Sequence, residues 1–194
     1  MKPLVFATGN ANKVAEVKLK LGDAYDFRSL SEIGCTEEIP ETSPTLEGNA
    51  LQKARYVVEH YGVDCFSEDT GLEVDALAGR PGVITARYAG PQRDPVANMQ
   101  QVLDELSDRD DRTAQFRAVI ALCQGGKEHL FEGIVRGRIA RTMRGTGGFG
   151  YDPIFIPEGY DQTFAELSPE VKKTMSHRSR AVAKLLAFLH SAHG

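Results

Sequence analysis

Apolar residues recur near the start of the chain first as a continuous run and then at helical spacing. The run from Leu4 to Ala7 ends at Thr8-Gly9-Asn10, and Val14, Val17 and Leu21 follow at intervals of three and four. This order predicts a short strand, a tight loop and an amphipathic helix.

A second helix is predicted to begin near residue 44, because Ser43 suits the N-cap position and Pro44 the first helical position. Apolar side chains at helical spacing mark one buried face, while Asn49 and Lys53, four residues apart, share a different face. The residues predicted to be buried are Leu46, Ala50, Ala54, Val57 and Tyr61.

The middle of the chain predicts a further strand and a third helix. Val63 to Ser67 reads as the strand, and Glu68-Asp69-Thr70-Gly71 reads as a turn that carries two carboxylates. Asp94-Pro95 repeats the pattern of a cap followed by proline, and the charged stretch from Ser107 to Arg112 is expected to be a solvated loop. The apolar residues of the third helix are Val96, Met99, Leu103 and Leu106.

The second half of the chain predicts a hairpin, a loop and a final helix. Ala114 to Cys123 is apolar at both alternations, as in a strand covered on both faces, and Gly125-Gly126 can turn it into a partner strand from Lys127 to Arg138. The glycine-rich segment from Gly145 to Pro153 is expected to be a loop. Ser168-Pro169 opens a short helical turn, and Ser176 caps the last helix.

Length and composition limit the class of protein. The chain has 194 residues, of which 41% are hydrophobic and 26% charged, so we expect one globular domain over residues 1–194, with room for two lobes but not for a second fold. The net charge of -4 argues against a general nucleic-acid or anionic-membrane binder. A polyanionic ligand would therefore need a local cluster of cations.

Cysteine and histidine spacing gives no metal or redox motif. Cys35, Cys65 and Cys123 lie far apart and are odd in number, which favours reduced, buried thiols over redox or zinc chemistry. The first residues contain too short an apolar stretch for a signal peptide, and no run reaches the roughly 20 residues of a membrane span. We expect a cytoplasmic protein.

Two segments in the first 70 residues could bind a metal-bound phosphate. Thr8 to Lys13, between a strand and a helix, would present backbone N–H groups and a lysine to an anion, although Asn10 or Asn12 could simply cap the helix. The second segment is acidic: Glu41 precedes the second helix, and Glu68-Asp69 is predicted at the end of a strand, where ligands bind in open α/β sheets. These carboxylates could coordinate magnesium or be solvated turn residues.

Two further segments could contact a flat, polar ligand. In Gly147 to Pro153 the glycines allow close approach, Phe149 and Tyr151 offer stacking faces and Asp152 an acceptor, unless the aromatic rings only fill a core edge. Lys172 and Ser176-His177-Arg178 offer donors near a helix start, or a capped helix with a polar first turn.

Together these motifs resemble the Ham1/RdgB family of inosine triphosphate pyrophosphatases (non-canonical purine NTP or dITP/XTP pyrophosphatases). TGNANK is similar to the T-G-N-x-x-K with which the family opens, and ETSPTLEGNALQKA to its E-T-x-x-T-x-x-x-N-A-x-x-K-A segment. SEDTGLEVDAL, RPGVITARYAG, GGFGYDPIF and SHR complete a match that covers nearly the whole chain.

The resemblance implies an α/β fold, with an elongated mixed β-sheet and helices in two lobes around a central substrate cleft. It implies Mg²⁺-dependent hydrolysis of dITP, ITP and XTP to the nucleoside monophosphate and pyrophosphate, by a homodimer that cleanses the nucleotide pool. The partner is then a small-molecule purine nucleoside triphosphate, with no nucleic acid and no membrane.

The resemblance also assigns roles to individual residues. Asp69, with Glu68, is implied as catalytic, and Glu41, Asp69 and Glu68 as metal-site acids. Triphosphate contacts are implied for Thr8, Gly9, Asn10, Ala11, Asn12, Lys13, Lys53 and Lys172. Further contacts, largely around the nucleoside, are implied for Thr70, Phe149, Gly150, Tyr151, Asp152, His177 and Arg178.

The chain departs from the family pattern at three positions. Ser43 stands where glycine is frequent, Gly48 where an acid is frequent, and Ile84 where tyrosine is common. None of these removes an implied ligand.

Two other classes of function stay open at the level of sequence. A non-enzymatic nucleotide-binding module would not need Glu41, Glu68 and Asp69. A magnesium enzyme that cuts at the gamma phosphate, or that acts on a pyrimidine or damaged nucleotide, would keep the same residue types.

Overall fold

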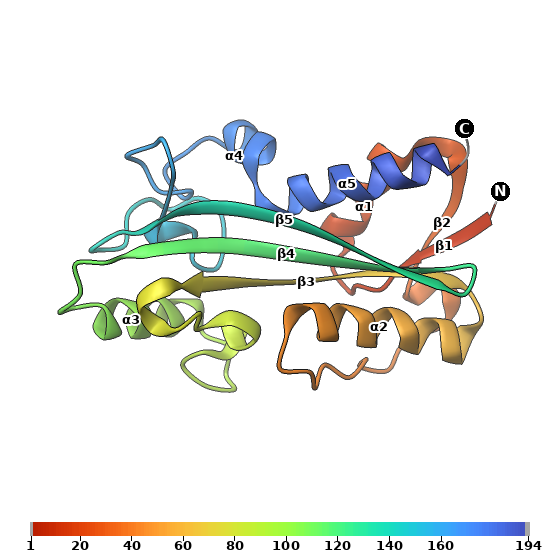
Figure 1. Cartoon of the computed structure of the whole chain (residues 1–194), viewed down its shortest axis with the longest axis horizontal. Helices are drawn as coiled ribbons and strands as arrows, with labels where there is room; N and C mark the ends of the chain where they lie inside the picture. The colour runs from red at the N-terminus through yellow and green to blue at the C-terminus, as the bar shows by residue number, and fades with distance from the viewer. Residues whose placement is uncertain (1, 193–194) are drawn as a thin grey trace. The chain divides into compact units, whose positions relative to one another are not determined.

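The computed structural model describes residues 2–192, apart from the side chain of Asn12. It has an α/β fold on a mixed six-stranded sheet with strand order β2-β1-β3-β4-β5-β6 (Figure 1). The chain divides into two compact units. Unit 1 comprises the residues up to Asp69, 118–132 and those from Ala181, and unit 2 comprises 70–117 and 133–180.

The predicted succession of elements is confirmed, and two short strands are added to it. The strands are β1 Lys2–Phe6, β2 Tyr25–Ser29, β3 Asp64–Val74, β4 Thr113–Gln124, β5 Lys127–Ile139 and β6 Phe155–Pro157. The helices are α1 Ala11–Leu21, α2 Leu46–Tyr61, α3 Pro95–Glu105, α4 Pro169–Met175 and α5 His177–Ser191. Short 3-10 helices span Gly22–Ala24, Ser31–Ile33, Asp75–Leu77, Gly82–Arg87 and Asp152–Ile154.

Unit 1 is a sheet with helices on both faces. β1 pairs in parallel with β2 and with the start of β3. Phe6 and Phe66 stack with ring centroids 4.5 Å apart, and the apolar faces of α1 and α5 pack against them in one buried cluster. Figure 1 shows α2 on the opposite side of the strands from α5. The loop after β1 leads directly into α1, which packs against the sheet.

Unit 2 has its own apolar core. Three rings from different segments, Phe116, Phe155 and Phe164, pack together with centroid separations of 4.5 to 6.1 Å. β6 pairs antiparallel with the end of β5, and buried residues of α3 complete the core. This core supports the loop that carries Phe149 and the helix α4 that carries Lys172.

Helix α2 begins two residues later than predicted. Thr45, not Ser43, is its N-cap, because the Thr45 hydroxyl accepts a hydrogen bond from Gly48 N at 3.0 Å. Ser43 instead accepts from Thr45 N at 3.2 Å, and Pro44 lies outside the helix. Ser43 and Thr45 both carry a hydroxyl that could cap the helix. Thr45 does so, and its backbone is extended, as is typical of an N-cap residue.

Ser43 and Gly48, two of the departures from the family pattern, are in close contact. A Cβ on Gly48 would collide with the Ser43 side chain and lie 2.9 Å from Thr45 Oγ1. We expect Gly48→Ala to lower the free energy of unfolding by about 1–2 kcal/mol through overpacking. In a Ser43→Gly background the cost of the same change should be smaller, because only the 2.9 Å contact with Thr45 Oγ1 is left. Urea unfolding of the unaltered protein, the two single variants and the double variant measures this dependence, and additive effects would contradict it.

Strand β3 is longer than predicted and overturns the predicted turn at 68–71. It runs without interruption from Asp64 to Val74, so Glu68 and Asp69 lie inside the strand and not at its end. Neighbours on a strand point to opposite faces, and the two carboxylates therefore do not share one face. The prediction of a turn that carries both carboxylates at a strand end is wrong.

Of the other local predictions, the hairpin and the buried cysteines are confirmed, whereas one position predicted to be apolar and buried is exposed. Gly125 and Gly126 both adopt positive φ, at 57° and 76°, and connect β4 to β5 in the predicted hairpin. All three cysteines are free and buried, and burial raises the pKa of Cys123 to about 11, as expected of unreactive thiols. Val96, predicted on the apolar face of α3, is 58% exposed. A single domain with two lobes and a cleft remains a prediction.

Candidate functional site

The loop after β1 is shaped by its own polar side chains. The Thr8 hydroxyl accepts from Asn10 N at 3.2 Å, and Asn10 Oδ1 accepts from Lys13 N at 3.2 Å. Asn10 therefore caps α1, as the simpler of the two sequence readings proposed, and Gly9 is exposed beside it. The side chain of Asn12 lies outside the described residues. The backbone N–H groups of this first turn still offer an anion site, because capping satisfies only part of them.

Lys13 faces a buried carboxylate. Its Nζ lies 3.5 Å from Glu68 Oε1, and the Glu68 side chain is only 3% exposed. A carboxylate at that depth is stabilised by a nearby cation. This geometry makes Glu68 the partner of Lys13 of α1, on the strand face opposite to Asp69.

Lys53 joins two segments that are distant in sequence. Its Nζ lies 2.6 Å from Glu41 Oε1, and it donates to the backbone carbonyl of Glu68 at 2.7 Å. Glu41 comes from the exposed loop before α2, whereas Glu68 and Asp69 come from β3. The ammonium group thus brings the acidic loop next to the strand that carries Asp69.

The three implied metal-site acids are not gathered into one cluster. Within residues 2–192, no group of three or more His, Cys, Asp or Glu side chains could hold a metal ion. Magnesium commonly takes only one or two protein carboxylates and completes its coordination with water and phosphate oxygens. The Glu68 carboxylate is turned toward Lys13, and the roles of Glu41 and Asp69 as metal ligands stay predictions.

Unit 2 contains a cavity of about 390 Å³ lined by most of the implied nucleoside contacts. Asp152, which is 4% exposed, accepts from Phe149 N at 3.1 Å and pairs with Lys172. The Lys172 ammonium lies 4.5 Å from the Phe149 ring centroid. Among the described residues this lysine therefore belongs to an aromatic cavity, whereas the resemblance assigned it to the triphosphate. Its role stays a prediction.

The two aromatic residues of the glycine-rich loop differ in their exposure to solvent. Phe149 is 66% exposed and can offer a stacking face. Tyr151 is buried, and its hydroxyl donates to Thr85 O at 2.5 Å. Burial raises the pKa of Tyr151 to about 12. Phe149 is therefore the residue able to stack on a flat ligand, and Tyr151 anchors the loop.

A histidine and a phenylalanine form another wall of this cavity. His177, the first residue of α5, stacks on Phe116 with centroids 4.9 Å apart and an interplanar angle of 16°. Arg178 follows in the same turn and is partly buried. Thr70 and Gly150 also line the cavity, and the nucleoside contacts that the resemblance implies for them stay predictions.

Several lining residues were missed by sequence reasoning. They include Thr85, Arg93, Asn98 and Phe116. Phe116 lies inside an apolar strand, where sequence gives no reason to expect a ligand contact. Thr85 lies in RPGVITARYAG, which carried the family resemblance but to which no role was assigned.

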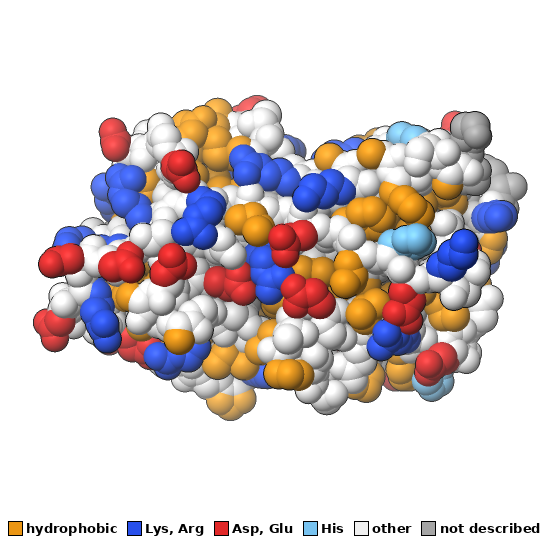
Figure 2. All heavy atoms as spheres, in the orientation of Figure 1, with side chains coloured by type: hydrophobic (Ala, Val, Ile, Leu, Met, Phe, Trp, Pro, Cys, Tyr) orange, Lys and Arg blue, Asp and Glu red, His pale blue; other side chains and the backbone are white. Residues whose placement is uncertain are grey.

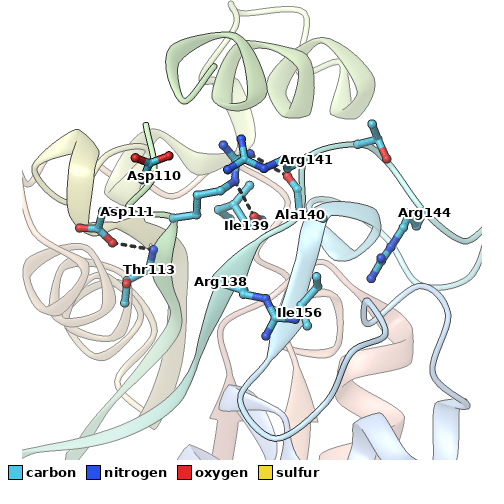
Figure 3. A pocket seen from close by; sticks show the side chains of 11 residues that line it. Asp110, Asp111, Thr113, Arg138, Ile139, Ala140, Arg141, Arg144 and Ile156 are labelled. Carbon is cyan, nitrogen blue, oxygen red and sulfur yellow. Dashed lines mark hydrogen bonds between the residues drawn. The ribbon is translucent and has the colours of Figure 1, made fainter. Parts of the chain in front are cut away.

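A second cavity in unit 2, of about 530 Å³, contains four arginines that could suggest a competing anion site (Figure 3). Arg138 pairs with Asp161 at 3.6 Å and Arg144 with Glu166 at 3.2 Å. Arg112 donates to three backbone carbonyls at 2.8 to 2.9 Å, those of Leu106, Ile139 and Ala140. Three of the four arginines thus already have partners within the protein.

Arg112 connects the segment after α3 to the end of β5, and burial lowers its pKa. We expect Arg112→Met to reduce the free energy of unfolding by about 3 kcal/mol, because three carbonyl groups lose their donors. Arg109→Met, at an exposed position in the same stretch, should change it by less than about 0.5 kcal/mol. Urea denaturation measures both, and equal effects of the two substitutions would show that Arg112 is not a structural connection.

Charge on the visible surface is mixed. Figure 2 shows Lys and Arg side chains interspersed with Asp and Glu side chains over this face, without a continuous field of one sign. In the described part of the chain no helix is long and apolar enough to cross a membrane.

Comparison with known proteins agrees with the motifs. The model of the Ham1 family matches residues 4–188. A dITP/XTP pyrophosphatase of Flavobacterium johnsoniae is 52% identical over 186 residues, which cover 96% of this chain and 97% of that protein. A dITP/XTP pyrophosphatase of Bacillus subtilis is 47% identical, with 98% of both chains covered.

Solved structures of Ham1 proteins are also similar to this chain. The Ham1 protein of Staphylococcus aureus superposes with a TM-score of 0.94 at 38% identity and covers 98% of this chain and 100% of its own. A nucleoside-triphosphatase, dITP/XTP pyrophosphatase, of Mycobacterium abscessus gives a TM-score of 0.85 at 44% identity, covering 95% and 98%. The mixed sheet, the cavity around Phe149 and these matches over nearly the full length identify the chain as a member of the Ham1 family.

Proposed function

We propose that the protein hydrolyses non-canonical purine nucleoside triphosphates, dITP, ITP and XTP, to the nucleoside monophosphate and pyrophosphate, and so removes deaminated purines from the nucleotide pool. The observation that carries this proposal is the position of Lys53, which contacts the Glu41 carboxylate and the backbone of β3 beside Asp69. Lys53 and the Glu41 carboxylate thus lie beside the segment of β3 that carries Asp69, and Lys13 near the start of α1 pairs with Glu68 of the same segment. The relatives named dITP/XTP pyrophosphatase support the choice of substrate.

We propose that magnesium is held by Glu41 and Asp69. The donors fit, because both are hard carboxylate oxygens and Glu41 already lies 2.6 Å from a cation, Lys53 Nζ. When bound, the ion would neutralise charge on the phosphates and polarise the phosphorus–oxygen bonds. Glu68, also implied as a metal ligand by the resemblance, instead holds Lys13 in this proposal.

The chain's own residues supply the rest of the chemistry. Lys13 and Lys53 offset the negative charge of the triphosphate, and the N–H groups at the start of α1 bind its oxygens. Asp69 accepts a proton from the water that attacks the alpha phosphorus, and the bond to the pyrophosphate oxygen breaks. No side-chain nucleophile is needed, because phosphoryl transfer depends mainly on positioning and charge stabilisation.

We propose that base selection takes place in the cavity around Phe149. Hypoxanthine and xanthine carry an acceptor at purine position 6, where adenine carries a donor amino group. His177, Arg178 and Lys172 are donors on or near the cavity wall. Two donors facing each other are both unsatisfied, so ATP should be disfavoured by roughly a hundredfold or more.

The experiment is a nucleotide panel with Mg²⁺ in which pyrophosphate and orthophosphate are measured separately. We expect pyrophosphate from ITP, dITP and XTP and at least about a hundredfold lower kcat/KM for ATP. Orthophosphate as the first product would indicate cleavage at the gamma phosphate and contradict the proposal. Equal turnover of ATP and ITP would contradict the selectivity argument.

We also propose that the protein acts as a homodimer in the cytoplasm, on a small-molecule substrate and without nucleic acid. The net charge of -4 and the mixed surface of Figure 2 support the absence of a nucleic-acid surface. Light scattering coupled to size-exclusion chromatography should give twice the chain mass of 21.2 kDa. A mass of one chain at micromolar concentration would contradict the dimer.

A further inference from the structure

One face of α2 carries four polar side chains at helical spacing. Asn49, Gln52, Lys53 and Tyr56 are separated by three, one and three residues, so they follow each other along a single face. Asn49 is 4% exposed, which is unusual for an amide unless it is hydrogen-bonded. The proposed reaction uses only Lys53 of this set.

Each of these side chains contacts the loop that precedes the helix. The later a residue stands in the helix, the earlier is the loop residue that it contacts. Asn49 Oδ1 accepts from Ser43 N at 2.8 Å. Gln52 makes two bonds to Thr42, accepting from its N–H at 2.8 Å and donating to its hydroxyl at 3.0 Å. Lys53 pairs with Glu41. The loop is therefore laid along the helix residue by residue.

The far end of the loop is held by two tyrosines of the same helix. Tyr56 donates to Glu37 Oε1 at 3.2 Å, and Tyr61 donates to the same oxygen at 2.5 Å. The hydrogen bond from Tyr61 lowers the pKa of Glu37 to about 2, so this carboxylate is ionised at all physiological pH values. Glu41 thus lies between two anchored points, Glu37 on one side and Thr42-Ser43 on the other.

These contacts matter because the loop has little else to hold it. Residues 37–42 contain no helix or strand, and all but residue 39 are exposed. An unrestrained loop of this kind would spread the Glu41 carboxylate over many positions, and its residues would lose conformational entropy at the moment of binding. Contacts made in advance remove that cost from binding.

We infer that the polar face of α2, with Glu37 as its distal anchor, is a positioning surface that holds the Glu41 loop ready for a divalent cation. The inference rests on the proposed function, since it takes Glu41 as a metal ligand. Gln52, Tyr56 and Tyr61 are then positioning residues, which act through the loop and do not touch substrate. Outer partners of this kind usually change metal affinity by tenfold or more when they are lost.

The test uses two variants that keep side-chain volume and remove hydrogen bonds. Tyr56→Phe/Tyr61→Phe takes away both donors to Glu37, and Gln52→Met takes away both bonds to Thr42. Tyr160→Phe, at a partly exposed tyrosine of unit 2, is the matched control. Mn²⁺ binding to the full chain is followed by electron paramagnetic resonance, and the dependence of ITP hydrolysis on Mg²⁺ concentration is measured in parallel.

We expect the Mn²⁺ dissociation constant and the apparent KM for Mg²⁺ to rise about tenfold in both variants, with kcat at saturating Mg²⁺ within twofold of the unaltered protein. Tyr160→Phe should change neither quantity. Amide hydrogen exchange of residues 37–43 should become faster in the variants, which shows that the loop was released.

Faster exchange without a change in Mn²⁺ affinity would overturn the inference, because the loop would then be anchored for stability alone. A fall in kcat that saturating Mg²⁺ does not restore would also overturn it. Undetectable Mn²⁺ binding by the unaltered protein would contradict it as well. Since Mn²⁺ binding is measured without nucleotide, these outcomes are separate from the question of which phosphate bond is cut.

Discussion

Replacement of Asp69 by asparagine is expected to lower kcat for ITP by about 10²- to 10⁴-fold, the range typical of a lost general base. Asparagine keeps the shape of the side chain but cannot accept the proton of the attacking water. Asp69 lies in β3, directly after the carbonyl that Lys53 contacts, so the substitution should leave the strand in place. The measurement is steady-state pyrophosphate release at saturating ITP and Mg²⁺.

Asp23→Asn is the matched control, because Asp23 is an exposed acid of the same unit in the 3-10 helix Gly22–Ala24. It should leave kcat within twofold. The thermal midpoints of both variants should stay within a few degrees of the unaltered protein. If Asp69→Asn hydrolysed ITP at a near-normal rate, the assignment of Asp69 as the base would fail.

Lys53→Met should reduce kcat/KM for ITP by about 10²- to 10³-fold, the second largest effect expected. The substitution removes the ammonium group that bonds both Glu41 and the Glu68 carbonyl, and it leaves less positive charge to face the triphosphate. Because the charge is needed in the transition state as well as in binding, both KM and kcat should change.

Lys184→Met provides the comparison for this variant. Lys184 also donates to a backbone carbonyl, that of Glu132 at 2.6 Å, within unit 1 but on α5 and far from the acidic loop in sequence. It should alter kcat/KM by less than twofold. Equal losses in the two variants would mean that Lys53 acts only by stabilising the fold.

Features set by local sequence were predictable. The strand, loop and helix around Thr8 follow from periodicity and from a capping asparagine, and the hairpin at Gly125-Gly126 follows from two residues that tolerate positive φ. Candidate site residues could likewise be chosen from the sequence, because few types of side chain bind metal ions or phosphates. The family resemblance added their roles.

Features set by distant contacts were not predictable. Glu68-Asp69-Thr70-Gly71 looks like a turn in isolation, yet β3 lies between β1 and β4 in the sheet, and pairing with neighbours outweighs the weak strand preference of its acids. The same limit applies to partners: that Lys172 pairs with Asp152 and Glu68 with Lys13 depends on packing, not on spacing. The choice of Thr45 over Ser43 as the cap of α2 likewise depends on the path of the loop, since Asn49, on the helix itself, accepts from Ser43 N and holds that residue outside the helix.

The proposed mechanism requires that water attacks the alpha phosphorus of a non-canonical purine triphosphate. Hydrolysis of ITP in ¹⁸O-labelled water, with mass analysis of both products, tests this requirement. We expect one ¹⁸O atom in inosine monophosphate and none in pyrophosphate. Label in orthophosphate, or in pyrophosphate with unlabelled monophosphate, would contradict it.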